Sequence, residues 1–217
     1  MKINRIILIA NGNFTDLDFY RSQIKENDYI ICADGGAKHA LSLGLTPHLI
    51  IGDLDSLEES ICRLLSEGPT QFIKYPSEKD ESDLELALLK ALDLEPQEII
   101  IWGALGKRVD HFYANLMLLT LSLKSGITTK LIDEDHEIFV TDKTIELKGE
   151  KGDYVSLFPF SPQVKGITTT GLKYPLKNET LYLGPTRGLS NEFITTVAKV
   201  TIDEGLLLVI KVRKRPF

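Results

Sequence analysis

Short apolar runs alternate with longer amphipathic stretches over the first 133 residues of the chain. The apolar runs, each of which predicts a strand, are Arg5 to Ala10, Tyr29 to Ala33, His48 to Ile51, Phe72 to Lys74, Glu98 to Trp102 and Lys130 to Asp133. The stretches between them carry apolar residues at helical spacing, as at Leu84, Leu88 and Leu92. Parallel strands need crossover connections, and strands that are apolar throughout are covered on both faces. This half therefore predicts a doubly wound α/β domain with a mostly parallel sheet.

The last helix of this half carries signals for both of its ends. Its apolar face is formed by Phe112, Leu116, Leu119 and Leu123. Asp110 stands before that face at the place of an N-cap, and Gly126 follows it as a stop signal. We therefore expect a long helix between these two residues.

The period of the pattern changes after about Glu137. The β-rich segments that follow are Tyr154 to Phe160, Val164 to Thr170, Thr180 to Leu183, Phe193 to Ile202 and Leu206 to Val212. Glycines and prolines separate these segments, as is typical of an antiparallel sandwich or barrel. We predict a smaller antiparallel β-sandwich domain at residues 137–217, after an α/β domain at residues 1–136.

Composition and charge narrow the class of partner. The chain has 217 residues and a formal net charge of -6, whereas nonspecific nucleic-acid binding depends on a basic surface. Cys32 and Cys62 lie in an apolar run and a helical pattern, which argues against a disulfide framework. Polar Asn11 comes too early for a signal peptide, and no apolar run approaches the ~18 residues of a membrane span. We expect a cytoplasmic protein without a nucleic-acid or membrane partner.

Acidic residues follow the apolar runs of the α/β half, at the point where each run ends. The segments concerned are Asp34-Gly35-Gly36, Gly52-Asp53-Leu54-Asp55-Ser56, Lys79-Asp80-Glu81-Ser82-Asp83 and Gly103 to His111. Open α/β sheets bind ligands outside the carboxyl ends of their strands, so these loops should meet at one edge of the sheet. The acids that they bring there are Asp34, Asp53, Asp55, Asp80, Asp83 and Asp110.

A divalent metal explains this crowding of carboxylates, because like charges repel one another unless a cation or a proton lies between them. Hard oxygen ligands beside phosphate suit Mg²⁺, and the chain's 4 histidines lack zinc spacing. Arg108 adds a planar positive group for phosphate oxygens, and the neighbouring glycines let backbone N–H groups approach a ligand closely. Together these residues predict a site for a Mg-nucleotide.

Each motif also has a purely structural interpretation. Asp34-Gly35-Gly36 taken alone is a common turn, and the residues from Gly52 onward suit a helix start with Ser56 as N-cap. The acids from Asp80 to Asp83 are typical of a first helical turn, which is also where His111 falls. Helix capping does not require an acid in every loop at the same sheet edge, and this repetition favours the metal site.

In these segments the sequence resembles the thiamine pyrophosphokinase family, and the likeness covers nearly the whole chain. The matching pieces are Asp34-Gly35-Gly36-Ala37, Pro47, Ile51 to Ser56, Lys79-Asp80, Ser82-Asp83, Gly106 to His111 and Asn115. The resemblance implies an α/β nucleotide domain, a β-sandwich and a homodimer whose substrate sites are shared between subunits. It also implies that the hydroxyl of thiamine attacks the β-phosphorus of ATP in the presence of Mg²⁺, so that thiamine diphosphate forms and AMP leaves.

The site chemistry and the resemblance together assign roles to individual residues. Binding of ATP is assigned to Asp34, Gly35, Gly36, Lys79, Asp80, Arg108 and His111. Catalysis is assigned to Asp53, Asp55, Asp83 and Asp110. Asp53, Asp55 and Asp83 are also the expected ligands of Mg²⁺, directly or through water. Asp83 and Asp110 are both open as the base that accepts the hydroxyl proton.

The residues assigned to thiamine are Ser82, Tyr174, Ser190 and Asn191. The segment from Gly171 to Leu176 resembles the family segment that presents an aromatic ring, and Leu189-Ser190-Asn191 resembles its Ser-Asn element. Some relatives have Trp at the place of Tyr174, while Ser82 stands where Thr is usual and Lys107 where Gly is usual. Without the resemblance, Tyr174 would be an ordinary strand aromatic and Ser190-Asn191 a polar turn.

Two other functions use the same acidic edge. A diphosphotransferase that acts on another small alcohol, such as a hydroxymethyl-pterin, would recognise Mg-ATP in the same way. Tyr174, Ser190 and Asn191 favour thiamine over that alcohol. A non-catalytic nucleotide-sensing module would bind Mg-nucleotide without turnover, but simple binding rarely needs so many acids. The sequence therefore favours a thiamine diphosphokinase over both.

Overall fold

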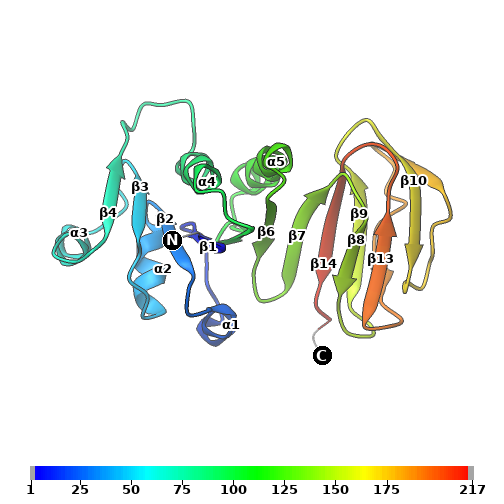
Figure 1. Ribbon diagram of the computed structural model, residues 1–217, viewed down its shortest axis with the longest axis horizontal. Helices are drawn as coiled ribbons and strands as arrows, with labels where there is room; N and C mark the ends of the chain where they lie inside the picture. The colour runs from blue at the N-terminus through cyan, green and yellow to red at the C-terminus, as the bar shows by residue number, and fades with distance from the viewer. Residues whose placement is uncertain (1–2, 215–217) are drawn as a thin grey trace. The chain divides into compact units, whose positions relative to one another are not determined.

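The computed structural model of the chain, drawn in Figure 1, describes residues 3–214. These residues form two compact units that divide between Glu134 and Asp135. The first unit contains helices α1 to α5 together with strands, and the described part of the second consists of strands joined by turns. Each unit has a hydrophobic core of its own.

The first unit is a parallel sheet with helices on both faces. Its strands are β1 (Arg5–Ile9), β2 (Tyr29–Ala33), β3 (Leu49–Gly52), β4 (Gln71–Lys74), β5 (Glu98–Trp102) and β6 (Thr128–Ile132). Its helices are α1 (Leu17–Gln23), α2 (Gly36–Ser42), α3 (Glu59–Ser66), α4 (Asp83–Asp93) and α5 (Val109–Ser125). The strand order is β6-β5-β1-β2-β3-β4 with each pairing parallel, which confirms the predicted doubly wound fold.

The strands of this unit are apolar throughout because both faces of the sheet are buried. Ile6 to Ile9 of β1 are fully shielded from solvent, and successive residues point to opposite faces. Ile7 and Ile9 share a core with residues of α1, α2 and α3. Helices α4 and α5 lie on the other side of the sheet (Figure 1) and bury leucines such as Leu88 and Leu119. The helices thus cover both faces of the sheet.

The predicted helix end at Gly126 is confirmed, whereas the two predicted N-caps are wrong. Gly126 ends α5 in the left-handed conformation with φ 69°, as predicted. Asp110 is not the N-cap of α5, because Arg108 holds that position and Asp110 lies in the first turn. Ser56 does not cap α3 either, since the N-cap of that helix is Glu58. Neither polar side chain is therefore explained by helix capping.

The second unit is a sandwich of two antiparallel sheets, which confirms the predicted β-sandwich. Its strands are β7 (His136–Thr141), β8 (Ile145–Lys148), β9 (Tyr154–Pro159), β10 (Gln163–Thr170), β11 (Glu179–Tyr182), β12 (Asn191–Glu192), β13 (Val197–Thr201) and β14 (Leu207–Val212). Within this unit, the strands of one sheet follow the order β12-β9-β14-β7, and the other sheet has the order β11-β10-β13-β8. Side chains of both sheets, such as Val155 and Val200, share one core.

The sandwich differs from the sequence prediction in two ways. Strands β7 and β8 and the short strand β12 are not among the predicted segments. The segment from Phe193 to Ile202, predicted as one strand, is interrupted before β13 begins at Val197. Phe193 is buried in the core and forms an isolated bridge with Leu172, while the hydroxyl of Thr195 donates to the carbonyl of Val197 at 2.7 Å and closes a turn. The chain turns here although its side chains follow a strand pattern.

Candidate active site

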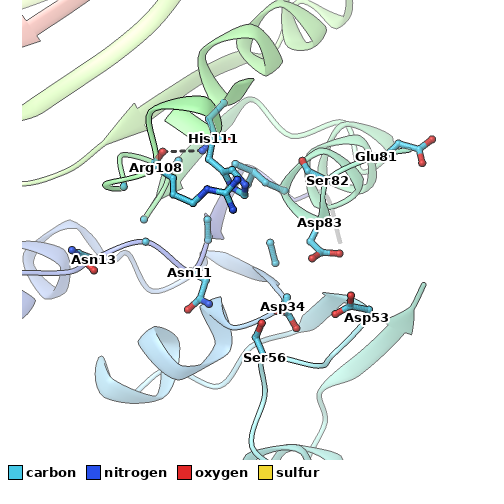
Figure 2. A pocket seen from close by; sticks show the side chains of 18 of the residues that line it. Asn11, Asn13, Asp34, Asp53, Ser56, Glu81, Ser82, Asp83, Arg108 and His111 are labelled. Carbon is cyan, nitrogen blue, oxygen red and sulfur yellow. Dashed lines mark hydrogen bonds between the residues drawn. The ribbon is translucent and has the colours of Figure 1, made fainter. Parts of the chain in front are cut away.

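A pocket of about 650 Å³ opens at the carboxyl ends of the strands of the first unit. Its walls come from the loops that follow β1, β2, β3 and β5 and from the segment that leads into α4. Figure 2 shows the acids Asp34, Asp53 and Asp83 on one side of this pocket and Arg108 and His111 on the other. The pocket therefore presents negative and positive charge to the same space.

Three carboxylates converge in the pocket. One oxygen each from Asp34, Asp53 and Asp83 lies within 4.8 Å of the others. Asp34 follows β2, Asp53 follows β3, and Asp83 is the first residue of α4. Three separate elements thus bring their acids to one point, with Asp34 at the place for which the sequence had predicted Asp55. A group of this kind can ligate a hard divalent cation.

The backbone around Asp34 is shaped for close approach. Asp34 has a positive φ of 42°, is 7% exposed, and its Oδ1 is buried without a hydrogen-bond partner. Gly52, at φ 154°, ends β3 beside it, and a Cβ at Gly52 would lie 2.9 Å from the Asp34 Cβ and 3.2 Å from Asp83 Oδ1. Any larger residue at position 52 would push the acids apart. A buried carboxylate oxygen without a donor is a group that a cation can satisfy.

Asp83 carries the clearest electrostatic signal of the cluster. Burial raises the pKa of Asp83, and the negative charges of Asp53 and Asp34 raise it further. Lys79 Nζ lies 3.0 Å from Asp83 Oδ1 and lowers the pKa of Asp83, but this attraction does not outweigh burial. Burial also works against the charge of Lys79, yet the acids around Lys79 leave its pKa above the ordinary value. The cluster is therefore held together by one lysine and keeps excess negative charge.

The basic side of the pocket is more exposed. Arg108 makes a bidentate ion pair with Asp110, in which Nε donates to Oδ1 at 3.2 Å and Nη2 to Oδ2 at 2.5 Å. Hydrogen bonding from Arg108 is the largest of the causes that lower the pKa of Asp110 to about 2. The Arg108 side chain is 70% exposed, so little burial has to be overcome for it to turn toward another anion. Phosphate is such an anion.

The structure brings many of the predicted residues to the pocket and leaves others outside it. The predicted residues that line it are Asp34, Asp53, Lys79, Ser82, Asp83, Arg108 and His111. Of the residues predicted for ATP, metal or catalysis, those that do not line it are Gly35, Gly36, Asp55, Asp80 and Asp110. Asp55 remains next to the cluster, because its backbone N–H donates to Asp53 Oδ1 at 3.1 Å. This hydrogen bond is the largest cause that lowers the pKa of Asp53.

Gly35 and Gly36 have a packing role in the structure. A Cβ on Gly36 would lie 2.0 Å from the carbonyl oxygen of Ile9, and a Cβ on Gly35 would lie 2.4 Å from Asn11 Nδ2. Both glycines therefore let the start of α2 press against the chain that leaves β1. They affect the shape of the pocket indirectly, through their packing against Asn11 and the end of β1.

The loop after β1 also forms part of the pocket, although it was not among the predicted site segments. Asn11, Gly12 and Asn13 line the pocket. They follow an apolar run, as the acidic segments do, but they carry no charge. The rule that ligands bind at strand ends would have found them if amide side chains had been considered together with carboxylates.

A second pocket of about 360 Å³ lies within the second unit. Tyr174, which is 62% exposed, lines it together with Arg187 and Leu189. Asn191 is buried and exchanges two hydrogen bonds with the backbone of Tyr174: Tyr174 N–H donates to Oδ1 at 3.0 Å, and Nδ2 donates to the Tyr174 carbonyl at 2.7 Å. Asn191 therefore fixes the segment that carries the ring. Ser190 does not line the pocket, and its N–H donates to the Ser156 hydroxyl.

Comparison with known proteins gives one consistent result. The family described as "Thiamin pyrophosphokinase, catalytic domain" matches residues 20–131, and "Thiamin pyrophosphokinase, vitamin B1 binding domain" matches residues 136–207. The thiamine pyrophosphokinase of Bacillus subtilis is 36% identical over 95% of this chain and 97% of its own. A crystal structure of the Bacillus subtilis protein has a TM-score of 0.88 at 32% identity, covering 98% of this chain and all of that one. Thiamin pyrophosphokinase from Candida albicans, at 16% identity, shares the fold with a TM-score of 0.80 over 97% of this chain and 89% of its own.

Proposed function

This chain belongs to the thiamin pyrophosphokinase family, and we propose on that premise that its two pockets bind the two substrates of one enzyme. Family membership makes the chain a transferase that forms thiamine diphosphate from thiamine and ATP. The acidic cluster lies in the part matched by the catalytic domain, and the Tyr174 pocket lies in the part matched by the vitamin B1 binding domain. ATP is accordingly proposed for the first pocket and thiamine for the second.

The proposed ATP site uses both sides of the first pocket. The cation of Lys79 and the guanidinium of Arg108 offer donors to phosphate oxygens, and His111 stands beside Arg108. Arg108 would exchange its contact with Asp110 for the phosphate chain, which its exposure permits. Gly35 and Gly36 support this site through packing, and Asp80 lies in the segment that carries Lys79 into the pocket.

Magnesium fits the acidic side of the pocket. The fit is indicated by the buried Oδ1 of Asp34, which accepts no hydrogen bond and lies in a group of three carboxylates. We propose that Asp34, Asp53 and Asp83 hold the ion, and Asp55, whose N–H orients Asp53, stays a predicted further ligand. Bound Mg²⁺ neutralises charge on the phosphate oxygens during transfer. The single observation that carries the proposal is the meeting of these acids from β2, β3 and α4.

The proposed thiamine site is built on the aromatic ring of Tyr174. Exposed aromatic rings stack well on flat heterocycles, and Asn191 holds the backbone of Tyr174 in place through two hydrogen bonds. Ser190 is anchored to Ser156 and supports the same segment. Ser82, which was also predicted to bind thiamine, lines the first pocket, and its hydroxyl accepts a hydrogen bond from the Glu85 N–H at 3.1 Å and caps α4.

In the proposed reaction the hydroxyl oxygen of thiamine forms a bond to the β-phosphorus of ATP. The bond between that phosphorus and the oxygen of the α-phosphate breaks, AMP leaves with the electron pair, and the hydroxyl proton passes to a base. Asp83 lines the pocket, but it is also a proposed ligand of Mg²⁺, and a carboxylate bound to a metal is a poor proton acceptor. Asp110 lies outside the pocket, and its pKa of about 2 reflects the ion pair with Arg108 that phosphate binding would break. Neither acid is therefore assigned as the base.

The assembly and the location of the enzyme are also proposals. We propose a homodimer in which each thiamine pocket is completed by the partner subunit, as the resemblance implies. Within residues 3–214, no helix has both the length and the apolar character needed to cross a bilayer. Cys32 and Cys62 are free thiols in the structure, which supports a reducing compartment such as the cytoplasm.

Calorimetric titration with ATP tests the site assignment. The wild-type protein should bind ATP more tightly in Mg²⁺ than in chelator, because the ion joins the acids to the phosphates. Asp53→Asn should remove most of this difference while retaining the fold. A Mg²⁺ effect on ATP affinity equal in Asp53→Asn and wild type would contradict the proposed metal site.

A further inference from the structure

A buried carboxylate behind the first pocket, Glu134, accepts hydrogen bonds from the chain that follows β1. Glu134 is 7% exposed and stands just after β6. Its Oε1 accepts the N–H groups of Thr15 at 2.9 Å and Asp16 at 3.0 Å and also the Thr15 hydroxyl. Its Oε2 accepts the hydroxyl of Tyr20 at 3.0 Å. Both oxygens are therefore used, and the donors Thr15, Asp16 and Tyr20 lie between β1 and the end of α1.

Glu134 is charged in this environment. Burial opposes its ionisation, but the hydrogen bonds from Thr15 and Tyr20 prevail and hold the pKa of Glu134 below its ordinary value. Burial and the charge of Glu134 raise the pKa of Tyr20, so its hydroxyl stays protonated and donates. Hydrogen bonds to an ionised acceptor are roughly twice as strong as those between neutral groups. Glu134 is thus a strong anchor for the segment that it holds.

The loop between β1 and Thr15, the first residue held by Glu134, lines the proposed ATP pocket, and its first residues have little conformational freedom. Gly12 N–H donates to the carbonyl oxygen of Gly103 at 2.8 Å, and a Cβ on Gly12 would lie 2.2 Å from the same oxygen. The side chain of Asn11 packs where a Cβ of Gly35 would be. Asn11, Gly12 and Asn13 are therefore placed against both neighbouring loops of the pocket.

Phe14 connects this loop to the anchor. It is the next residue after Asn13, and its ring stacks on that of Tyr20 with centroids 4.0 Å apart. The hydroxyl of Tyr20 in turn donates to Glu134. The C-terminal end of the loop is thereby held in two ways. The Thr15 N–H donates directly to Glu134, and Phe14 stacks on Tyr20, whose hydroxyl donates to the same carboxylate.

We propose that Glu134 is a positioning residue for the nucleotide, which holds residues 11–14 as a preformed wall of the ATP pocket. The proposal rests on the proposed function, because it requires that this pocket bind ATP. A residue that only stabilised the fold would, when replaced, lower the melting temperature without changing the affinity for ATP. A positioning residue changes that affinity as well, because the wall must be ordered when the ligand binds.

The chain offers a matched control in Asp28. Asp28 is a carboxylate of the same unit, 9% exposed, which accepts hydrogen bonds from Arg5 Nε at 2.7 Å and from the Lys25 N–H at 2.7 Å. It stands just before β2, at the amino edge of the sheet, and does not line the pocket. Asp28→Ala and Glu134→Ala therefore both remove a buried, hydrogen-bonded carboxylate, and only the second removes contacts to the segment that follows the pocket wall.

The experiment measures melting temperature, the Kd for ATP in Mg²⁺, and KM for each substrate. Both alanine variants should melt at lower temperature, and Glu134→Ala alone should raise the Kd and KM for ATP, on the order of tenfold. The KM for thiamine and kcat at saturating ATP should stay within about twofold of wild type, since the acids and Tyr174 are untouched. Glu134→Gln should bind ATP almost as wild type does, because its amide can accept from Thr15 and donate to Tyr20.

Two results would overturn the positioning role. The first is ATP binding by the wild type together with the same Kd in Glu134→Ala and Asp28→Ala. If Glu134→Ala does not fold, Thr15→Val removes one donor to Glu134 and should raise the Kd for ATP about twofold to threefold. An unchanged Kd in Thr15→Val is then the second overturning result. A wild-type protein that does not bind ATP at all would overturn the proposed function and this proposal with it.

Discussion

Replacing Asp34 by Asn should stabilise the protein in chelator and weaken its response to Mg²⁺. Asp34 is buried, its Oδ1 has no hydrogen-bond partner, and it lies with Asp53 and Asp83 in the acidic cluster. Asn has the same size and tolerates the positive φ of 42° at this position. The variant therefore removes one negative charge with little other change.

The size of the effect follows from the separation of the carboxylates. Two unit charges 4.8 Å apart repel by about 0.9 kcal/mol at a dielectric constant of about 80 and about 3.5 kcal/mol at about 20. The cation of Lys79 offsets part of this repulsion, since it lies close to the same acids. We expect a net gain of about 1 kcal/mol in the free energy of unfolding, which corresponds to about 2–4 °C in Tm for a protein of this size.

Thermal unfolding with and without metal measures both halves of the prediction. In chelator, Asp34→Asn should melt above the wild type. A ligand at about 100 times its Kd stabilises the folded state by about 2.7 kcal/mol, so Mg²⁺ should raise the Tm of the wild type. Asp34→Asn should show a smaller rise at the same Mg²⁺ concentration, because one proposed ligand has lost its charge.

Two outcomes would refute this reasoning. A lower Tm of Asp34→Asn in chelator would show that the carboxylate of Asp34 contributes favourably without metal and that no repulsion is stored there. An equal rise of Tm with Mg²⁺ in both proteins would show that Asp34 does not contact the ion. Asp18→Asn, at an exposed residue that does not line the pocket, controls for a general effect of reduced negative charge.

Tyr174→Ala should raise the KM for thiamine about twofold to twelvefold and leave ATP affinity unchanged, because stacking contributes about 0.5–1.5 kcal/mol beyond buried area. Tyr182→Ala, at a ring of similar exposure outside the pocket, is the control, and an unchanged KM for thiamine in Tyr174→Ala would exclude the ring from the site. Asp55→Asn should abolish turnover and retain the fold if Asp55 ligates Mg²⁺. Asn serves nearly as well as Asp in a turn or cap, so nearly full activity would show that Asp55 only shapes the loop around Asp53.

The parallel sheet could be predicted because its signal is repeated along the chain. Runs such as Ile6 to Ile9 are apolar at each position, and only burial on both faces explains this. The strand-end rule then placed Asp34, Asp53 and Asp83 near one another, although they are far apart in sequence. Topology decides this kind of proximity, and topology was readable from the alternation of strands and helices.

Other features depend on contacts that sequence does not record. The choice between Asp34 and Asp55 for the inner cluster depends on how the backbone turns after β2 and β3, including the positive φ of Asp34. Phe193 to Ile202 has apolar side chains in a strand pattern, but the chain turns at Thr195. Glu134 follows a strand like the pocket acids, yet its donors come from residues 15 to 20, more than a hundred positions earlier.

The most direct test of the account is the mass analysis of products after incubation of the wild-type protein with ATP, Mg²⁺ and thiamine. The account predicts thiamine diphosphate and AMP in equal amounts, with no product in chelator, because the β- and γ-phosphates move as one unit from a metal-bound nucleotide. Formation of ADP together with thiamine monophosphate would contradict the proposed attack on the β-phosphorus. Thiamine-independent turnover of ATP alone, or the same yield of products in chelator, would contradict the assignment of the two pockets and of the acidic cluster.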